Sequence, residues 1–274
     1  MNHSPSSTLH SPLRIGVFDS GLGGLTVLQA ILKQIKGVEV FYIADTKNAP
    51  YGEKTPQQIL DFSLAITRYF VSHYNIDVLV VACNTATSAA IATLRQEFPT
   101  LLIVGTEPAL KPAIEQSRSA KVGVLATPAT LKGDKYQSLA DRLSTHKEVR
   151  LYEQACAGLV EHIENNTLES KESLTLLEGW LAPMREAGVD TIVLGCTHYP
   201  LAKEVITSVM GKEICLLDSG EAIAKRVLSL IAQKGHTNEG KNSVTLLCTG
   251  TIEKEMVERI LSLPIETISL LPHE

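Results

Sequence analysis

Short apolar runs alternate with segments of helical periodicity along the first third of the chain. After the first run, apolar residues recur at helical spacing at Leu25, Leu28, Leu32 and Ile35. A second helix is expected from Thr55 followed by Pro56, with its buried face at Ile59, Phe62, Ile66 and Phe70. A third helix is predicted over Thr87–Arg95. The apolar runs, each predicted as a strand, are Arg14–Phe18, Val40–Ile43, Asp77–Cys83 and Leu101–Val104. This alternation predicts an α/β fold with a parallel sheet covered on both faces.

The second half of the chain repeats this order. Lys121–Leu125 resembles Arg14–Phe18, which lies 107 residues earlier in the chain. Asp190–Cys196 resembles Asp77–Cys83, which lies 113 residues earlier. A further apolar strand follows at Ile214–Leu217. We interpret the pattern as two similar parallel-sheet α/β domains related by a pseudo-two-fold, with a cleft between them. Chance similarity among buried strands is the alternative.

Composition limits the classes of function. The 274 residues are 44% hydrophobic and 20% charged, with a net charge of −5 and no concentrated basic stripe, which argues against a nucleic-acid partner. No apolar run approaches the roughly 20 residues that span a bilayer, so we expect no membrane association. Residues 1–12 are polar and predict a disordered tail without the apolar segment of a signal peptide. A cytoplasmic protein is expected.

Five widely spaced cysteines lack any CxxC pair, so neither a disulfide framework nor a zinc site is indicated. Cys83 and Cys196 each end a predicted strand, in Cys83-Asn84-Thr85 and in Cys196-Thr197-His198. Ligands of parallel sheets bind outside the carboxyl ends of the strands, so two facing domains would place one thiol on each wall of the cleft. We interpret the other three cysteines, Cys156, Cys215 and Cys248, as small buried hydrophobic residues.

Two identical groups on opposite faces of a carbon can invert it by proton transfer, because the reverse reaction exchanges their roles. A free thiol has a pKa of about 8.5, so neighbouring groups must tune the pair near neutral pH. Asp19 and His198 are candidates for this tuning. Hydroxyls that could bind the carboxylate of a small acid are those of Ser20, Thr85 and Thr197. The alternative, purely structural interpretations are that Asp19 caps the following helix and that His198 is an ordinary core or surface histidine.

The glycine-rich run Gly21-Leu22-Gly23-Gly24 follows the first strand. It does not match a dinucleotide fingerprint, because the third glycine would fall at Thr26, and no Walker A pattern is present. We expect these glycines to permit a tight turn or a close approach of the backbone to a small ligand.

Four segments in this order resemble the bacterial glutamate racemases: FDSGLGG (18–24), PYG (50–52), ACNTATS (82–88) and GCTHYPL (195–201). The resemblance implies a cofactor-independent racemase that interconverts L- and D-glutamate and supplies D-glutamate for peptidoglycan. It also implies two α/β domains in which the chain crosses back. The first domain would comprise residues 13–106 and 217–274, and the second residues 107–216.

The resemblance further implies roles for individual residues. Cys83 and Cys196 would exchange the proton on opposite faces of the substrate, assisted by Asp19, His198 and Glu164, with Glu161 on the same helix as the alternative to Glu164. Thr127 and Thr130 resemble a Thr-x-x-Thr pattern of the second domain. The residues expected to bind substrate or tune the thiols are Asp19, Ser20, Tyr51, Gly52, Asn84, Thr85, Thr197 and His198.

Two other functions stay open at this point. An aspartate racemase or a related two-cysteine isomerase would share the architecture, since one methylene is worth only about 1–3 kcal/mol of discrimination. A non-catalytic binding module for acidic ligands would carry the same cysteines without chemistry. The resemblance also implies a homodimer and, for some members, activation by UDP-N-acetylmuramoyl-L-alanine. No metal and no pyridoxal phosphate are expected.

Overall fold

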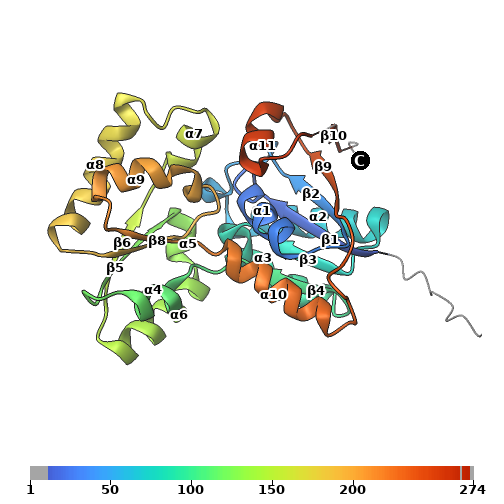
Figure 1. Cartoon of the computed structure of the whole chain (residues 1–274), viewed down its shortest axis with the longest axis horizontal. Coiled ribbons are helices and arrows are strands. Elements are labelled where there is room, and N and C mark those ends of the chain that lie inside the picture. The colour runs from blue at the N-terminus through green and yellow to red at the C-terminus, as the bar shows by residue number, and fades with distance from the viewer. Residues whose placement is uncertain (1–11, 266, 272–274) are drawn as a thin grey trace, which may run out of the picture.

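The computed structural model describes residues 12–265 and 267–271 of the chain. Two parallel sheets form the centres of two α/β domains that lie side by side (Figure 1). The first sheet has six strands in the order β10-β9-β2-β1-β3-β4. These strands are β1 (Leu13–Asp19), β2 (Val38–Ala44), β3 (Val78–Val81), β4 (Leu102–Gly105), β9 (Ser243–Cys248) and β10 (Ile268–Leu270).

The second sheet repeats the strand order of the first. Its order is β6-β5-β7-β8, which matches β2-β1-β3-β4 position by position. Its strands are β5 (Lys121–Ala126), β6 (Arg150–Ala155), β7 (Thr191–Leu194) and β8 (Cys215–Leu217). The two-domain α/β fold and the repeated plan are therefore confirmed.

Helices cover both faces of the first sheet because its strands are apolar on both sides. Side chains such as Ile15 and Val17 on β1 pack with α1, α10 and α11, whereas Phe18 packs on the opposite face with α2 and α3. These helices are α1 (Leu25–Gln34), α2 (Pro56–Tyr69), α3 (Asn84–Glu97), α10 (Gly220–Ala232) and α11 (Lys254–Leu261), with η1 (Tyr51–Glu53) and η2 (Phe70–Tyr74) beside α2.

The second domain has its own apolar clusters on the two faces of its sheet. Leu125 packs with α7, α8 and α9, whereas Val122 and Val124 pack with α4 and α6. The helices are α4 (Leu110–Gln116), α5 (Pro128–Lys132), α6 (Asp134–Lys147), α7 (Leu159–Glu164), α8 (Lys171–Glu186), η3 (Tyr199–Ala202) and α9 (Lys203–Met210). No helix among the described residues is long and apolar enough to span a membrane.

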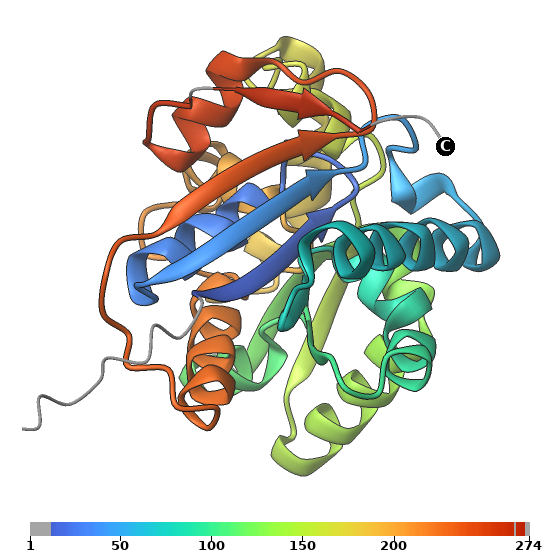
Figure 2. The ribbon, with the colours of Figure 1, turned by 90° about the vertical axis from the view of Figure 1, so that its right-hand side faces the viewer.

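The end of the chain returns to the first sheet. Figure 2 shows β9 lying along β2, and their register pairs Glu39–Ala44 with Ser243–Cys248. β8 still belongs to the second sheet, where Leu217 pairs with Val193, so Leu217 lies one residue beyond the predicted boundary at 216. The exact domain limits remain a prediction, and the predicted tail lies, apart from Pro12, outside the described residues.

Local boundaries near the strand ends differ from the prediction. The third helix begins at Asn84 instead of Thr87, because Cys83 serves as its N-cap and its sulfur accepts a hydrogen bond from the Ala86 amide. The predicted start of α2 is correct, since Thr55 forms a capping box with Gln58. β6 was not predicted. It is an edge strand whose residues are only partly buried, so it lacks an apolar run.

Candidate active site

The carboxyl ends of strands from both sheets border one cavity. It encloses about 580 Å³ of empty space, counting the part open to solvent. Cys83 follows β3 of the first domain, and Cys196 follows β7 of the second. Both thiols line this cavity, as does most of the predicted substrate-binding set: Ser20, Tyr51, Gly52, Asn84, Thr85, Thr197 and His198.

Cys83 is a buried thiol at the start of α3, only 5% exposed. Its sulfur lies 3.9 Å from the Ser20 hydroxyl and 3.4 Å from the Ala86 amide nitrogen. Burial, and next the negative charge of Asp19, raise the pKa of Cys83, and the Ala86 amide offsets only part of this. The thiol form is therefore favoured.

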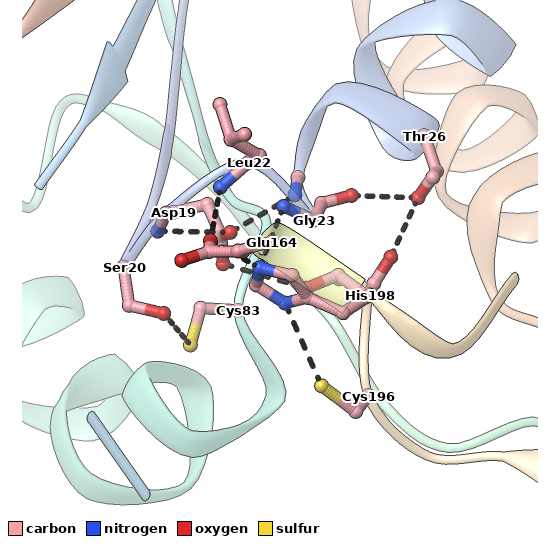
Figure 3. A network of polar contacts seen from close by, with 12 residues as sticks. Asp19, Ser20, Leu22, Gly23, Thr26, Cys83, Glu164, Cys196 and His198 are labelled. Atoms are coloured by element: carbon pink, nitrogen blue, oxygen red, sulfur yellow. Dashed lines mark hydrogen bonds and ion pairs between the residues drawn. The ribbon is translucent and has the colours of Figure 1, made fainter. Parts of the chain in front are cut away.

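Cys196 faces a histidine that is itself paired with a carboxylate. The Cys196 sulfur lies 3.8 Å from Nδ1 of His198, and Nε2 of His198 lies 2.8 Å from Oε1 of Glu164 (Figure 3). Burial lowers the pKa of His198, but hydrogen bonds to Cys196 and Glu164 outweigh it and raise that pKa well above 6.5. Burial raises the pKa of Glu164, but its contact with His198 prevails and lowers it below 4.5. A charged imidazolium–carboxylate pair is the favoured state.

Nε2 of His198 has two alternative contacts. The amide nitrogen of Gly23 lies 3.0 Å from this atom, on which Glu164 also converges. One ring nitrogen cannot accept from Gly23 and donate to Glu164 at once. In the favoured imidazolium, Nε2–H donates to Glu164, and the Gly23 amide can donate only after Nε2 has lost its proton.

The glycine-rich turn after β1 accommodates residues of the second domain. A Cβ on Gly23 would lie 2.6 Å from the backbone nitrogen of His198, and one on Gly21 would overlap Oε1 of Glu164. The groups that approach this turn closely are therefore His198 and Glu164. None of its three glycines lines the cavity, and the expected approach to a small ligand remains a prediction.

Asp19 is fully buried behind the cavity wall. Its Oδ2 accepts hydrogen bonds from the amides of Gly21 at 3.1 Å and Gly24 at 3.0 Å, and its Oδ1 lies 3.4 Å from the Thr197 hydroxyl. Burial raises the pKa of Asp19, against the opposing effects of His198 and the two amides. Asp19 thus orders the turn that leads into α1, and it contacts Thr197 directly.

Three threonine hydroxyls meet across the domain boundary at the cavity. Thr85 lies 3.1 Å from Thr127 and 3.3 Å from Thr130, and these two lie 2.9 Å apart. Beside them, Oδ1 of Asn84 is buried without a hydrogen-bond partner among the described residues. The unpartnered oxygen of Asn84 is therefore available to a polar ligand, and Thr85 and Thr127 line the same cavity.

Tyr51 is a buried residue that lines the cavity. Its hydroxyl donates a 2.5 Å hydrogen bond to Asp45, which also contacts Asn48 and Thr249. The hydroxyl is thus engaged within the first domain.

The two glutamates of α7 have different positions. Glu164 contacts His198 and accepts a hydrogen bond from the Leu22 amide, whereas Glu161 lines the cavity. Cys156 also lines the cavity, although its sequence context suggested only a small hydrophobic residue. The signal that could have identified it is its place directly after a strand, which was hidden because β6 itself was not predicted.

Other lining residues lacked any chemical signature in the sequence, namely Pro50, Glu53, Pro128, Ala157, Gly158 and Val160. No group of three or more metal-ligating side chains occurs within residues 12–265 and 267–271. The arrangement can hold a small anion with hydroxyls and amides, and it can give or take a proton at two separate thiols.

Comparison with known proteins agrees with this geometry. The sequence profile described as Asp/Glu/hydantoin racemase matches residues 15–227. A glutamate racemase of Sulfurovum is 59% identical over 91% of this chain and 94% of its own length, and one of Aliarcobacter butzleri is 56% identical over 91% and 95%. The structure of Escherichia coli glutamate racemase with L-glutamate and the activator UDP-MurNAc-Ala superposes with a TM-score of 0.81 at 32% identity, covering 95% of this chain and 98% of that one.

Proposed function

Because the chain belongs to the Asp/Glu/hydantoin racemase family, we propose that it is a glutamate racemase that uses two cysteines. The observation that carries the proposal is that Cys83 and Cys196, from different domains, line one cavity. One thiolate removes the α-proton of glutamate. The other thiol gives a proton to the opposite face, and the reverse reaction exchanges the two roles.

The two thiols have unequal surroundings, which suits this exchange. Burial and Asp19 raise the pKa of Cys83, so it carries its proton in the resting enzyme. Cys196 instead lies 3.8 Å from the ring of His198, whose protonated form is favoured. We therefore assign the resting proton to Cys83.

The substrate carboxylates are bound by neutral donors in this proposal. The hydroxyls of Ser20, Thr85 and Thr197, the Asn84 side chain and the backbone of Gly52 line the cavity. Preorganised donors of this kind also stabilise the charge that develops on the α-carboxylate when the α-proton leaves. Asp19, Glu164 and His198 act as positioning residues, with His198 also facing the Cys196 thiol.

We propose that no cofactor takes part. The described lining contains no lysine that could form a Schiff base, and thiol bases act on the α-proton directly. The physiological setting we infer is the cytoplasm, where the product D-glutamate enters peptidoglycan synthesis and the five cysteines stay free thiols. Activation by UDP-MurNAc-Ala, which the Escherichia coli structure contains, belongs to the same proposal and is tested by adding that compound to the assay.

The deciding experiment follows each glutamate enantiomer in deuterated water. Proton nuclear magnetic resonance reports loss of the α-proton signal, and circular dichroism reports loss of optical activity in the same samples. We expect both signals to decay from either enantiomer without added cofactor. If neither enantiomer exchanged its α-proton, the protein would be a non-catalytic binding module for acidic ligands. If aspartate, assayed side by side, were turned over faster than glutamate, aspartate would be the substrate.

A further inference from the structure

The cavity lining has an unusual charge for a site that takes a dicarboxylate. Its acidic side chains are Glu53 and Glu161, and no lysine or arginine occurs among its described residues. The one imidazolium of the lining, His198, is paired with Glu164. Glu53 is exposed on η1, where water screens its charge. Glu161 is half-buried on α7 of the second domain, so its charge is screened less.

Glu161 has no role in the pairs that organise the site. Within the part of the chain that the structure describes, its carboxylate makes neither a side-chain hydrogen bond nor an ion pair. Glu164, three residues later, occupies the position against His198 (Figure 3). Glu161 instead lines the cavity together with Cys196. It is also close to Tyr199, whose pKa is raised first by burial, then by Cys196 and Cys156, and to a smaller extent by Glu161.

An unpaired carboxylate on this wall repels any dicarboxylate that enters. Glutamate differs from a plain five-carbon dicarboxylate by the ammonium group on its α-carbon. In the proposed reaction this carbon lies between the two thiols. That single positive charge is attracted by Glu161 and offsets the repulsion of the carboxylates. A dicarboxylate without an ammonium group has no such compensation.

We propose that Glu161 is a specificity-determining residue that selects α-ammonium dicarboxylates over dicarboxylates lacking the ammonium group. The inference rests on the proposed function, because it takes glutamate as the substrate of this cavity. Glu161 acts here by charge, because it repels dicarboxylates that would otherwise bind to the same hydroxyls and amides.

The test compares glutamate with glutarate, the same chain without the amino group. The Michaelis constants of both glutamate enantiomers, the inhibition constant of glutarate and its calorimetric dissociation constant are measured for the wild type, Glu161→Gln and Glu161→Asp. The relevant quantity is KM for glutamate divided by Ki for glutarate. We expect Glu161→Gln to raise this ratio by about tenfold, because the variant removes one partly buried unit charge from the cavity lining.

Glu161→Asp keeps the charge and is expected to stay within about twofold of the wild-type ratio. Glu53→Gln, which removes an exposed carboxylate from the same lining, is the matched control and should change the ratio by less than about twofold. A ratio for Glu161→Gln that rises by less than about threefold, or falls, overturns the proposal, including the case in which both ligands weaken together. Wild-type protein that binds glutarate without racemising glutamate would refute the proposed function instead.

Discussion

At the scale of single residues, the two thiols differ in what surrounds them. Cys83 is buried beside Asp19 and Ser20, whereas Cys196 faces the ring of His198. Neither sulfur is bonded to the other, and both remain free thiols. The proposed mechanism requires one of them on each face of the α-carbon, so the loss of either should stop racemisation without unfolding the protein.

Cys83→Ala and Cys196→Ala are each expected to lower the racemisation rate by at least about 10²–10⁴-fold, the usual contribution of a positioned proton-transfer group. A single remaining thiol can still exchange the α-proton of one enantiomer with solvent. Circular dichroism measures racemisation, and nuclear magnetic resonance in deuterated water measures exchange. Cys215→Ala, which changes a half-buried thiol near Gln116, is the control. Full racemase activity in either active-site variant would contradict the mechanism.

His198 should make stability depend on pH in a defined direction. Its folded pKa lies well above 6.5, so folding favours the protonated ring, and this contribution is complete below 6.5 and lost as pH rises through the folded pKa. Glu164 has a lowered pKa, so its contribution is present above 4.5 and lost as pH falls through its folded pKa. The pair therefore stabilises the fold most at pH values above 4.5 and below 6.5.

The expected outcome is that the free energy of unfolding of the wild type, relative to His198→Gln, falls as the pH rises above 6.5 and through the raised pKa of His198. Urea denaturation at several pH values measures this difference. Glu164→Gln should show a smaller fall, because it removes one of the two hydrogen bonds that raise the His198 pKa. Identical pH dependence in the wild type and His198→Gln would show that the ring is not protonated in the folded protein.

At the scale of elements, the turn between β1 and α1 packs tightly against the second domain. The backbone of this turn packs so closely on His198 that a Cβ at Gly23 would lie 2.6 Å from the His198 backbone nitrogen. A backbone atom cannot move away as a flexible side chain can. The turn therefore couples the position of α1 to the position of His198.

Gly23→Ala is expected to displace His198 and to lower kcat by up to about 10²-fold, the cost of a misplacement near 1 Å. Overpacking should also reduce the free energy of unfolding by about 1–3 kcal/mol. Gly179→Ala on the exposed face of α8, where nothing lies within 4 Å of the added Cβ, should instead raise stability by about 0.5–1 kcal/mol. Steady-state kinetics and urea denaturation measure the two effects, and wild-type kcat in Gly23→Ala would refute the coupling.

At the scale of the whole molecule, the two domains differ in chain continuity. The second sheet is formed by consecutive strands β5 to β8, whereas the first sheet needs β9 and β10 from the end of the chain. α1 also packs against α10 and α11. An N-terminal fragment therefore lacks part of its own core.

We expect a fragment of residues 107–219 to unfold cooperatively on heating and a fragment of residues 13–106 to show no cooperative transition. Thermal circular dichroism of the two fragments checks this. Neither fragment should racemise glutamate, because each carries one thiol of the pair. A cooperative transition in the N-terminal fragment would show that β9 and α10 are dispensable for its core.

The sequence by itself determined the α/β class, the repeated succession of elements along the chain and the placement of Cys83 and Cys196 at strand ends. These follow from apolar runs, helical spacing and turn residues, which are local properties of the chain. Such local patterns could not show which glutamate of the short helix α7 belongs to the site. Glu161 and Glu164 lie three residues apart on nearly the same face, so no periodicity distinguishes them.

Only the tertiary structure decided which glutamate meets His198. Glu164 is held there by the Leu22 amide and by His198 itself, contacts that join residues 142 and 34 positions apart. The same holds for β9 beside β2 and for the three threonine hydroxyls across the domain boundary. Such contacts depend on how two separately folded sheets pack against each other, and the free energy of that packing is a property of the assembled surfaces, which no local stretch of sequence contains.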